Sequence, residues 1–520
     1  MKKKIFILLT GFILPLSGVY AQYAEDALRF SQTEQGATAR FRALGSAQTA
    51  VGGDLSSLSG NPAGLGLFTR SDISLTADFT NTNIDASYFG ENTASQVDKL
   101  GLTHIGGVWH NAIRKPQGSD LNTGWLSFNF GVSYSKTNNL NSSLDYKGIN
   151  SSSSFADYLA DITNSYLQYG DPALNPNDDL VISPDFYTLE DMAYSNYLIE
   201  YSPDGYFATT ELNNSQRNSV YRTGSQSEVN FGFGANYSNR LFIGASIALT
   251  SLNYTADRQF NEAGLTRSFQ GQEPDFAGGQ YSLDYRSYQN TTGSGVNLKL
   301  GMIYRASDNV RLGFDFITPT WYSLTDDYSE GLDTRYWRQD GSAVLPPYTN
   351  DDADYYLNYN LRTPYRLNGG IAVTFANKGL ISGDIEYMDY SSMHFSSKND
   401  KGLEESNNRD IRNTYTSAVN FRLGAEYRLN DFLSLRAGYN TSGNPYKHLE
   451  YAKENISGGL GYRTGNFYLD LTYVNAAVKY DSRPYLISES YPDFNDTGAG
   501  EPASIKNTRS SVFLTIGTRF

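Results

Sequence analysis

Apolar and polar side chains alternate with a period of two along most of this chain, from residue 69 to its last residue. In one such segment Leu126, Phe128, Phe130, Val132 and Tyr134 alternate with Ser127, Asn129, Gly131 and Ser133. Because successive side chains of a strand point to opposite faces, this period predicts β-strands. One face is almost purely apolar and the other mixes glycine, amides, arginine and carboxylates. That contrast is typical of a membrane barrel with lipid outside and a wet lumen inside.

The segments predict an all-β fold, a transmembrane antiparallel β-barrel of about fourteen strands. Tight turns and long polar stretches alternate between them, as expected when short turns lie on one side of a membrane and long loops on the other. The largest polar stretch, 138–226, is expected to be an extracellular loop with a short amphipathic helix over 154–166. The predicted strands lie near 69–80, 101–111, 125–137, 227–239, 241–256, 281–304, 309–324, 354–376, 379–395, 411–429, 432–441, 454–463, 466–480 and 508–520.

The stretch 42–68 differs from everything that follows it. Its sequence is RALGSAQTAVGGDLSSLSGNPAGLGLF, in which Asp54 is the one charged side chain after Arg42. Glycine and proline at this density disfavour a regular helix or a central strand, and the segment is too apolar for a solvated linker. We therefore predict a hatch, or plug, inside the barrel lumen. The predicted hatch residues are Gly45, Gly52, Gly53, Asp54, Asn61, Pro62 and Ala63.

The amino terminus has the three parts of a secretory signal peptide. Lysines at positions 2–4 form the basic region, 5–16 the apolar region, and Ala21 ends a small-residue cleavage site. We expect cleavage before Gln22 and a location in the outer membrane of a Gram-negative bacterium. The expected organisation is a signal peptide over 1–21, an N-terminal extension and hatch over 22–68, and a barrel over 69–520.

The composition narrows the classes of function. The absence of cysteine excludes a disulfide scaffold, a zinc–thiolate site and a cysteine nucleophile. The net charge of −14 argues against nucleic acid as a partner. The four histidines, His104, His110, His394 and His448, have neither the spacing of metal ligands nor that of a catalytic triad. We therefore predict no enzyme activity, no metal and no cofactor.

The triplet Asn61-Pro62-Ala63, directly before the first predicted strand, resembles the hatch of the FadL/TodX-type outer-membrane transporters of long-chain fatty acids and other hydrophobic compounds. The resemblance also includes 43–47 and the Asp54 that follows Gly52-Gly53. It implies passive uptake, in which loops capture a hydrophobic substrate, an internal pocket receives it and movement of the hatch releases it. A gap in the wall is one implied route of exit into the membrane. The longest loop here follows the third strand rather than the fifth, which leaves the substrate class open.

Two kinds of side chain are candidates for ligand binding. Lumen-facing arginines could hold a substrate carboxylate, or could pair with lumen carboxylates such as Glu386, Glu426 and Asp470. Loop aromatics could form a capture groove, or could simply pack within loops and girdles. The candidates are Arg311, Arg422, Arg436, Phe155, Tyr158, Tyr166, Trp321 and Trp337, with Arg428 and Arg519 as further lumen-facing arginines.

Two hatch residues carry alternatives of their own. Asp54 could pair with a lumen arginine, since an unpaired carboxylate in a narrow lumen is unfavourable, or could remain hydrated. Asn61 and Pro62 could join the plug to the wall, or could form an ordinary Asn-Pro turn.

Two functions other than hydrophobic uptake stay open from the sequence. One is an aqueous porin for small solutes, and the other is a structural or adhesive surface barrel that uses its Tyr/Asn-rich loops. The partners we expect are a hydrophobic small molecule, outer-membrane lipid and the outer-membrane assembly machinery. The last of these rests on the final strand, which ends in Phe520 and resembles the signal that this machinery reads.

Overall fold

The computed structural model describes residues 18–168, 188–267, 278–487 and 502–520, apart from positions 35, 119, 204, 350–351, 376–377, 399 and 450. The helices and 3-10 turns are α1 (Gly18–Ser31), α2 (Ala39–Ala43), η1 (Leu55–Leu58), η2 (Pro62–Leu67), α3 (Phe155–Gln168), α4 (Leu189–Ser195), η3 (Tyr390–Ser392) and α5 (Lys401–Thr414). A separate hairpin consists of β5 (Ile199–Ser202) and β6 (Gly205–Ala208). No described helix is both long and apolar enough to cross a membrane.

The remaining strands form one sheet. They are β1 (Asp72–Tyr88), β2 (Glu91–Ala112), β3 (Trp125–Asn139), β4 (Ser142–Asn150), β7 (Asn214–Tyr237), β8 (Leu241–Leu265), β9 (Gln280–Arg305), β10 (Val310–Ile317), β11 (Trp321–Trp337), β12 (Ala343–Thr349), β13 (Ala353–Arg362), β14 (Arg366–Phe375), β15 (Gly379–Asp389), β16 (His394–Ser397), β17 (Ser417–Arg428), β18 (Leu433–Ser442), β19 (Ala452–Thr464), β20 (Phe467–Ser482) and β21 (Ala503–Arg519).

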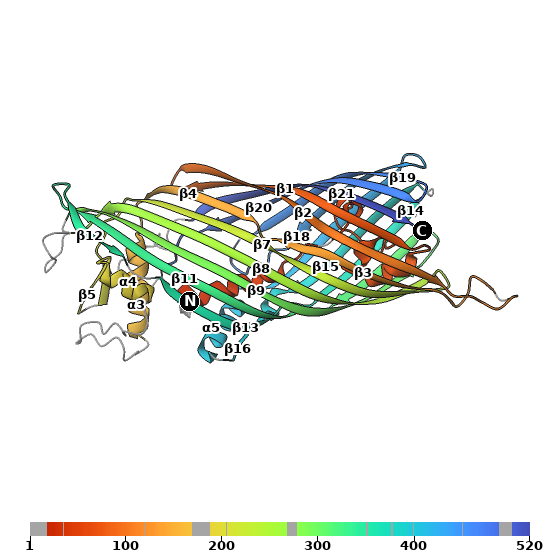
Figure 1. Ribbon diagram of the computed structural model, residues 1–520, viewed down its shortest axis with the longest axis horizontal. Helices are drawn as coiled ribbons and strands as arrows, with labels where there is room; N and C mark the ends of the chain where they lie inside the picture. The colour runs from red at the N-terminus through yellow and green to blue at the C-terminus, as the bar shows by residue number, and fades with distance from the viewer. Residues whose placement is uncertain are drawn as a thin grey trace, which may run out of the picture.

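The sheet closes on itself, because β1 pairs with both β2 and the last strand, β21. Some strands continue in line after a short break, as β3 does into β4 and β10 into β11. With these joined, the wall is an antiparallel barrel of fourteen strands (Figure 1), which confirms the predicted fold class. Prolines 319 and 364 lie at two of the breaks, where a residue without a backbone N–H interrupts the ladder.

The strands reach further than the alternation predicted. The stretch 81–100, predicted as a connection, is a hairpin between β1 and β2, with Phe89 and Gly90 at positive φ in its turn. The predicted loop 138–226 is shorter, because the wall continues to Asn150 and resumes at Asn214. The helix expected over 154–166 is found within it as α3. Alternation was not recognised here because the pattern is reversed: the outward side chains are mostly polar, and the apolar ones, such as Ile84, Tyr88 and Tyr146, lie on the inner face.

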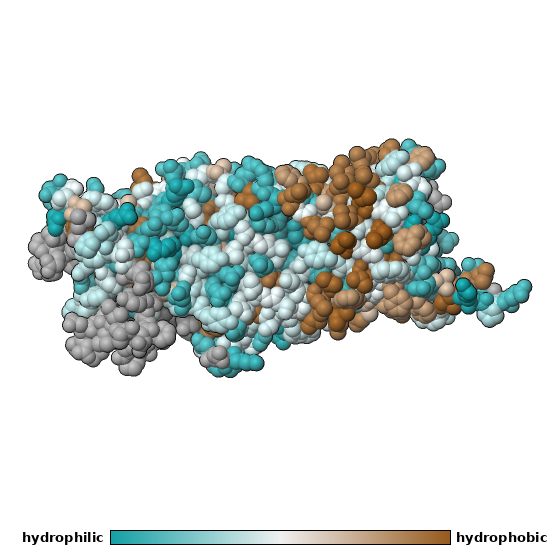
Figure 2. Space-filling view, viewed as in Figure 1, coloured by the Kyte–Doolittle hydropathy of each residue, from teal (hydrophilic) through white to brown (hydrophobic). Residues whose placement is uncertain are grey.

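An apolar band on the outer surface explains that polarity. Exposed apolar side chains gather around one half of the barrel, and the other half is hydrophilic (Figure 2). Members of the band include Ile73, Leu75, Leu298, Leu300, Phe421, Leu423, Leu469, Leu471, Leu514 and Ile516. An apolar band of about 25 Å crosses a bilayer, whereas the 26 residues of β9 extend over roughly 85 Å at about 3.3 Å per residue. The far half of the barrel therefore stands outside the membrane.

The wall is also uneven in height. Strands β7, β8 and β9 have 24, 25 and 26 residues, and with β10–β11 they form what we call the tall wall. Strands β15, β17, β18 and β19 have 11, 12, 10 and 13 residues, and they form the low wall. Two local signals end the low strands: Asp389 caps η3 by accepting a hydrogen bond from the Ser391 amide, and Pro445 follows β18.

Three pieces of chain fill the bore. The plug, residues 38–68, lies at the end where the chain terminates (Figure 1). Helix α1 lies further along, with Tyr23, Ala27 and Phe30 packed against wall residues that include Tyr254 and Tyr359. The cap, made of α3, α4 and the β5–β6 hairpin, packs on the inner face of the tall wall at the far end.

Candidate functional site

The plug touches the wall backbone to backbone at glycines. A Cβ added at Gly438 would lie 2.0 Å from the Gly45 nitrogen, and one at Gly244 would lie 2.3 Å from the Pro62 carbonyl. A Cβ added at Gly313 would likewise lie too close to the backbone carbonyl of Thr49. The glycines on the lumen face of the predicted strands therefore make room for the plug.

The predicted hatch glycines are required by their backbone conformation. Gly45, Gly52 and Gly53 have φ of +61°, +61° and +70°, a left-handed region that side-chain-bearing residues rarely adopt. Asp54 accepts hydrogen bonds from the Thr38 hydroxyl at 2.8 Å and the Ser56 amide at 2.9 Å. Asp54 thus caps η1 and joins two segments of the plug through hydrogen bonds. Within the described chain it forms no ion pair with an arginine.

The triplet at 61–63 contacts both plug and wall. The Asn61 side-chain oxygen accepts from the Ala63 amide at 3.0 Å, and its nitrogen donates to the Thr49 carbonyl at 2.7 Å. The same nitrogen lies 3.4 Å from the wall carbonyl of Met302. Ala63 packs against Phe242, which belongs to the wall. This geometry is that of a junction rather than of an isolated turn.

A chain of ion pairs, which we call the latch, joins the plug to the low wall. Arg40 of α2 donates two hydrogen bonds to Glu426, at 2.9 and 3.1 Å. Glu426 also accepts from Arg436 at 2.6 Å, and Arg436 in turn pairs with Asp470. Arg40 was not among the predicted site residues, since a basic residue beside the hatch motif carries no local sign of a partner 386 positions away.

Between the plug and the cap the bore widens into a chamber of about 1180 Å³. Its floor includes Arg42 and Ser46 of the plug together with Tyr23 and Arg29 of α1, and its roof includes Phe155 of the cap. Tyrosine is the commonest residue type of the lining: Tyr23, Tyr158, Tyr254, Tyr285, Tyr328, Tyr355, Tyr356, Tyr390, Tyr446, Tyr451, Tyr480 and Tyr485. Their rings offer apolar faces and their hydroxyls polar tips, so the chamber suits a ligand with both characters.

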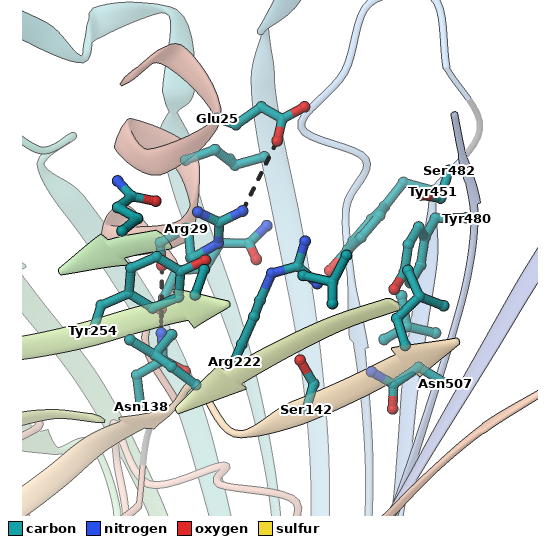
Figure 3. Close-up of a pocket in the computed structure, with 18 of the residues that line it drawn as sticks. Glu25, Arg29, Asn138, Ser142, Arg222, Tyr254, Tyr451, Tyr480, Ser482 and Asn507 are labelled. Atoms are coloured by element: carbon teal, nitrogen blue, oxygen red, sulfur yellow. Dashed lines mark hydrogen bonds and ion pairs between the residues drawn. The ribbon is translucent and has the colours of Figure 1, made fainter. Parts of the chain in front are cut away.

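Arg222 of β7 is the notable cation of this chamber. Its side chain extends into the cavity toward Tyr451 and Tyr480 (Figure 3). It makes no hydrogen bond or ion pair with any other described residue, and its Nε atom is buried without a partner. By contrast, Arg29 pairs with Glu25 and Asp26 and lies 4.9 Å above the Tyr254 ring. Arg222 thus has a guanidinium available for a ligand.

Carboxyl groups in and near the chamber are shifted by their surroundings. Burial raises the pKa of Glu190, on α4 of the cap, to about 7, and the neighbouring carboxylates Glu330 and Asp191 add to this. Burial raises the pKa of Asp26, on α1, to about 6, although Arg29 opposes the shift. Both groups would otherwise be fully ionised near neutral pH.

The predicted arginines are mostly engaged. Arg422 lines the chamber but pairs with Glu386, and Arg436 belongs to the latch. Arg311 donates to the Val51 carbonyl of the plug at 3.0 Å. These partners agree with the alternative that lumen arginines pair with their neighbours. Arg222 was missed because it falls within the stretch predicted as the 138–226 loop, although Gln216, Asn218 and Val220 share its inward face.

The predicted aromatics divide in the same way. Phe155 and Tyr158 line the chamber. Trp321 is 48% exposed at the start of β11, and neither it nor Trp337 contributes to the chamber lining. Tyr166 belongs to α3, and its side chain lies outside the described part of the structure.

A seam runs beside the chamber, between β2 and the β3–β4 strand. Ladder pairing between β2 and β3 stops at His104 opposite Ser135, so residues 91–103 of β2 pair along the sheet only with β1. Across the seam the Thr93 hydroxyl donates to the Asp145 carbonyl at 2.5 Å. Leu100, on the outer face beside the seam, is exposed. Along this part of the wall, side-chain hydrogen bonds replace backbone pairing.

No protein-family profile matches the chain, and no curated protein matches it in sequence. Among solved structures, a FadL homologue of Pseudomonas aeruginosa is similar at 11% identity and a TM-score of 0.52, covering 94% of this chain and 98% of that one. The toluene transporter TodX of Pseudomonas putida is similar at 15% identity and a TM-score of 0.48, covering 94% of this chain and 99% of that one. The toluene transporter TbuX of Ralstonia pickettii is similar at 15% identity and a TM-score of 0.44, covering 94% of this chain and 99% of that one.

The likeness to the FadL homologue extends over almost the whole of both chains. At 11% identity this likeness establishes the fold alone. The chain therefore has the FadL/TodX-type barrel fold that its hatch sequence resembles.

Proposed function

We propose that this chain is a passive outer-membrane transporter, which takes up hydrophobic compounds that carry one polar end. The observation that supports this most directly is the chamber, a cavity of about 1180 Å³ between a plug and a cap. Ligand pockets usually measure about 300–1,000 Å³, so the chamber is large enough for an extended amphipathic molecule. An apolar molecule avoids its hydration penalty while it lies in such a site.

The lining suggests how the ligand would be held. Its apolar body would lie on the tyrosine rings, and its polar end would accept hydrogen bonds from Arg222. A guanidinium fork matches a carboxylate, so fatty acids and aromatic acids are the first ligands to test. In this proposal Arg222 takes the role for which the sequence offered Arg311, Arg422 and Arg436 as candidates.

The route that we propose leads from outside the cell into the chamber and then past the plug. The plug end would face the periplasm and the cap the exterior, since the long connections lie at the cap end. The seam between β2 and β3 would give a sideways exit into the lipid. Export by the signal peptide over 1–21, and assembly through the strand that ends at Phe520, belong to the same proposal.

Binding of an 11-carbon fatty acid with a dansyl label on its tail tests this function. We expect saturable fluorescence on titration of the purified protein, lost in a chamber-filling variant, Ser287→Trp, which corrects for partitioning into detergent. Arg222→Gln should weaken binding of this carboxylate about tenfold or more, because a hydrogen bond to a charged group contributes about 1.5–3 kcal/mol. Arg217→Gln is the matched control, since Arg217 lies on the same strand with an exposed side chain that pairs with Asp145.

Two results would count against the proposal. If neither fatty acids nor toluene bound saturably, the proposed uptake of hydrophobic compounds would be wrong. Steady ionic conductance by the unaltered protein in planar bilayers would favour an aqueous porin, whereas contacts between plug and wall as extensive as those described support a nearly silent barrel.

A further inference from the structure

The far end of the barrel is occupied by the cap. Phe155, Leu159 and Met192 of the cap pack into one buried cluster with tall-wall residues that include Phe260 and Tyr285. Phe155 lies 5.0 Å from Phe260 and 5.1 Å from Tyr285, measured between ring centroids. A cluster of this kind is held together like a protein core, so the described residues at this end of the barrel leave no ready path to the chamber.

Among the described residues, the low wall leaves a gap in the side of the barrel at the same height. The short strand β16 covers β13 only from Tyr359 to Arg362, so residues 353–358 of β13 pair along the sheet only with β11. The next strand, β17, begins at Ser417 opposite Asp389, and β18 ends at Ser442. Above these points no strand of the described chain stands between the free edge of β13 and β20.

The exposed part of the chamber lining gathers at this gap. Among the described lining residues, the exposed side chains come from α1, the free edge of β13, the start of α5, the segment after β18 and the end of β20 with the residues after it. They are Glu25, Asp354, Tyr356, Asp400, Leu449, Asp481, Arg483 and Leu486. The lining residues from β7, β8, β9, β11, α3 and α4 are all buried or half-buried.

Helix α1 shows the same asymmetry within the bore. Ala24 and Ala27 are buried against the walls, whereas the side chain of Glu25 is 73% exposed although the helix lies inside the barrel. Solvent therefore reaches the inside of the barrel from the low-wall side.

We infer that the chamber is entered from the side, through this gap above the low wall, rather than through the end of the barrel. The inference rests on the proposed function. We call the gap the window, bounded by residues 353–358, Asp400, Leu449 and 481–486. Leu449 and Leu486 are 51% and 42% exposed at its rim, and apolar side chains so placed offer a first contact for a ligand with an apolar body.

The lack of cysteine in this chain allows a clean test, because each cysteine variant then carries a single thiol. Leu449→Cys and Leu486→Cys place the thiol at the window rim. Leu265→Cys is the matched control, an exposed leucine at the far end of β8 that does not line the chamber. Each variant is coupled to a bulky maleimide–polyethylene glycol, and the binding kinetics of the dansyl fatty acid are followed by stopped flow.

Labels at the window rim should slow both association and dissociation about tenfold, because an obstructed entrance lowers both rates together. The label at Leu265 should have no effect. Slowing by the Leu265 label alone would place the entrance at the barrel end, and unchanged rates in every variant would place it elsewhere in the wall. Either result overturns the window.

A second measurement keeps the window testable if the fatty acid does not bind. A chamber thiol, Ser287→Cys, is reacted with a small water-soluble methanethiosulfonate. Leu449→Trp together with Leu486→Trp should slow this reaction, and Leu265→Trp should not. Equal reaction rates would overturn the window, whereas failure of the dansyl fatty acid and toluene to bind the unlabelled protein would count only against the proposed function.

Discussion

The plug and the cap fill the two ends of one barrel by different physical means. The plug meets the wall through backbone contacts at glycines and through polar side chains, such as the two amides of residues 48 and 49 that donate to Asp384 at 2.7 and 2.8 Å. Its apolar clusters are small. The cap is held mainly by one large aromatic and aliphatic cluster, and hydrogen bonds such as that from the Phe155 amide to Glu262 add to it.

This difference teaches which end is suited to move. Hydrogen bonds between plug and wall can be exchanged for bonds to water in the lumen at a small net cost, because a typical bond contributes only about 0.5–1.5 kcal/mol. Displacing the cap would expose its apolar cluster, at about 25 cal/mol for each Å². We therefore propose that the plug is the movable closure and the cap the fixed one, in line with the proposed entrance at the side.

The largest effect should come from the latch. Glu426→Gln leaves Arg40 without its counter-charge in a mostly buried pair, and removal of one partner from a fully buried pair costs about 3–5 kcal/mol. We expect a loosened plug and a clear rise in conductance in planar bilayers. Glu454→Gln is the control, since Glu454 accepts a hydrogen bond from Tyr439 at an exposed site. A conductance equal to that of the unaltered protein would mean that the latch does not hold the plug.

The next effect should appear in the cap. Phe155→Ala removes a buried ring from the cluster, a change that costs about 3–5 kcal/mol in protein cores. Limited proteolysis should then cut within the segment 151–213 much faster, while the barrel remains resistant and its conductance stays low. Tyr197→Ala, at an exposed cap residue, serves as the control. An opened pore in Phe155→Ala would contradict the division of roles between cap and plug.

A smaller effect is expected at the wall glycines. Gly244→Ala places a methyl group against the Pro62 backbone, and overpacking of this kind costs about 1–3 kcal/mol. The plug should shift and conductance should rise modestly. Gly369→Ala is the matched control, because its added methyl would meet only the Ile385 side chain at 3.7 Å. Equal behaviour of the two variants would show that the plug is not fitted to these glycines.

The smallest effect concerns pH and the cap. Burial raises the pKa of Glu190 to about 7, so the folded cap holds this proton more tightly than the opened cap. Its contribution to stability is complete below pH 4.5 and is lost as the pH rises through about 7. Proteolysis of 151–213 should therefore be faster at pH 8 than at pH 5, because the cap loses stability of order 1–2 kcal/mol over this pH range. Glu190→Gln should flatten this dependence, and an unchanged pH profile in that variant would assign it to other groups.

Much of the fold could be predicted from local pattern. Lipid on one side of a strand and plug or water on the other impose the alternation seen at residues 126–134, and every barrel strand in the membrane shows it. The alternation was not recognised at 81–100 and 214–226, where the outward face of the wall is mostly polar and the apolar side chains, such as Ile84, Tyr88 and Val220, face inward. The left-handed conformations at Gly45, Gly52 and Gly53 were likewise within reach, because only glycine adopts them readily.

The chamber and the pairing of its arginines could not be predicted from local pattern. Arg222 and Arg422 both alternate with outward residues, and no local feature shows that Arg422 has Glu386 as a partner while Arg222 has none. The partner of Arg40 lies 386 positions away. Such pairings depend on the register and stagger of strands around the whole barrel.

The sequence by itself determined the barrel, its strand number and the presence of a plug, because each follows from what a residue and its near neighbours face. Tertiary structure decided the unequal wall heights, the latch, the free guanidinium of Arg222 and the opening above the low wall. These depend on where strands end relative to partners distant in the chain, and loop closure places such partners together without leaving a local pattern.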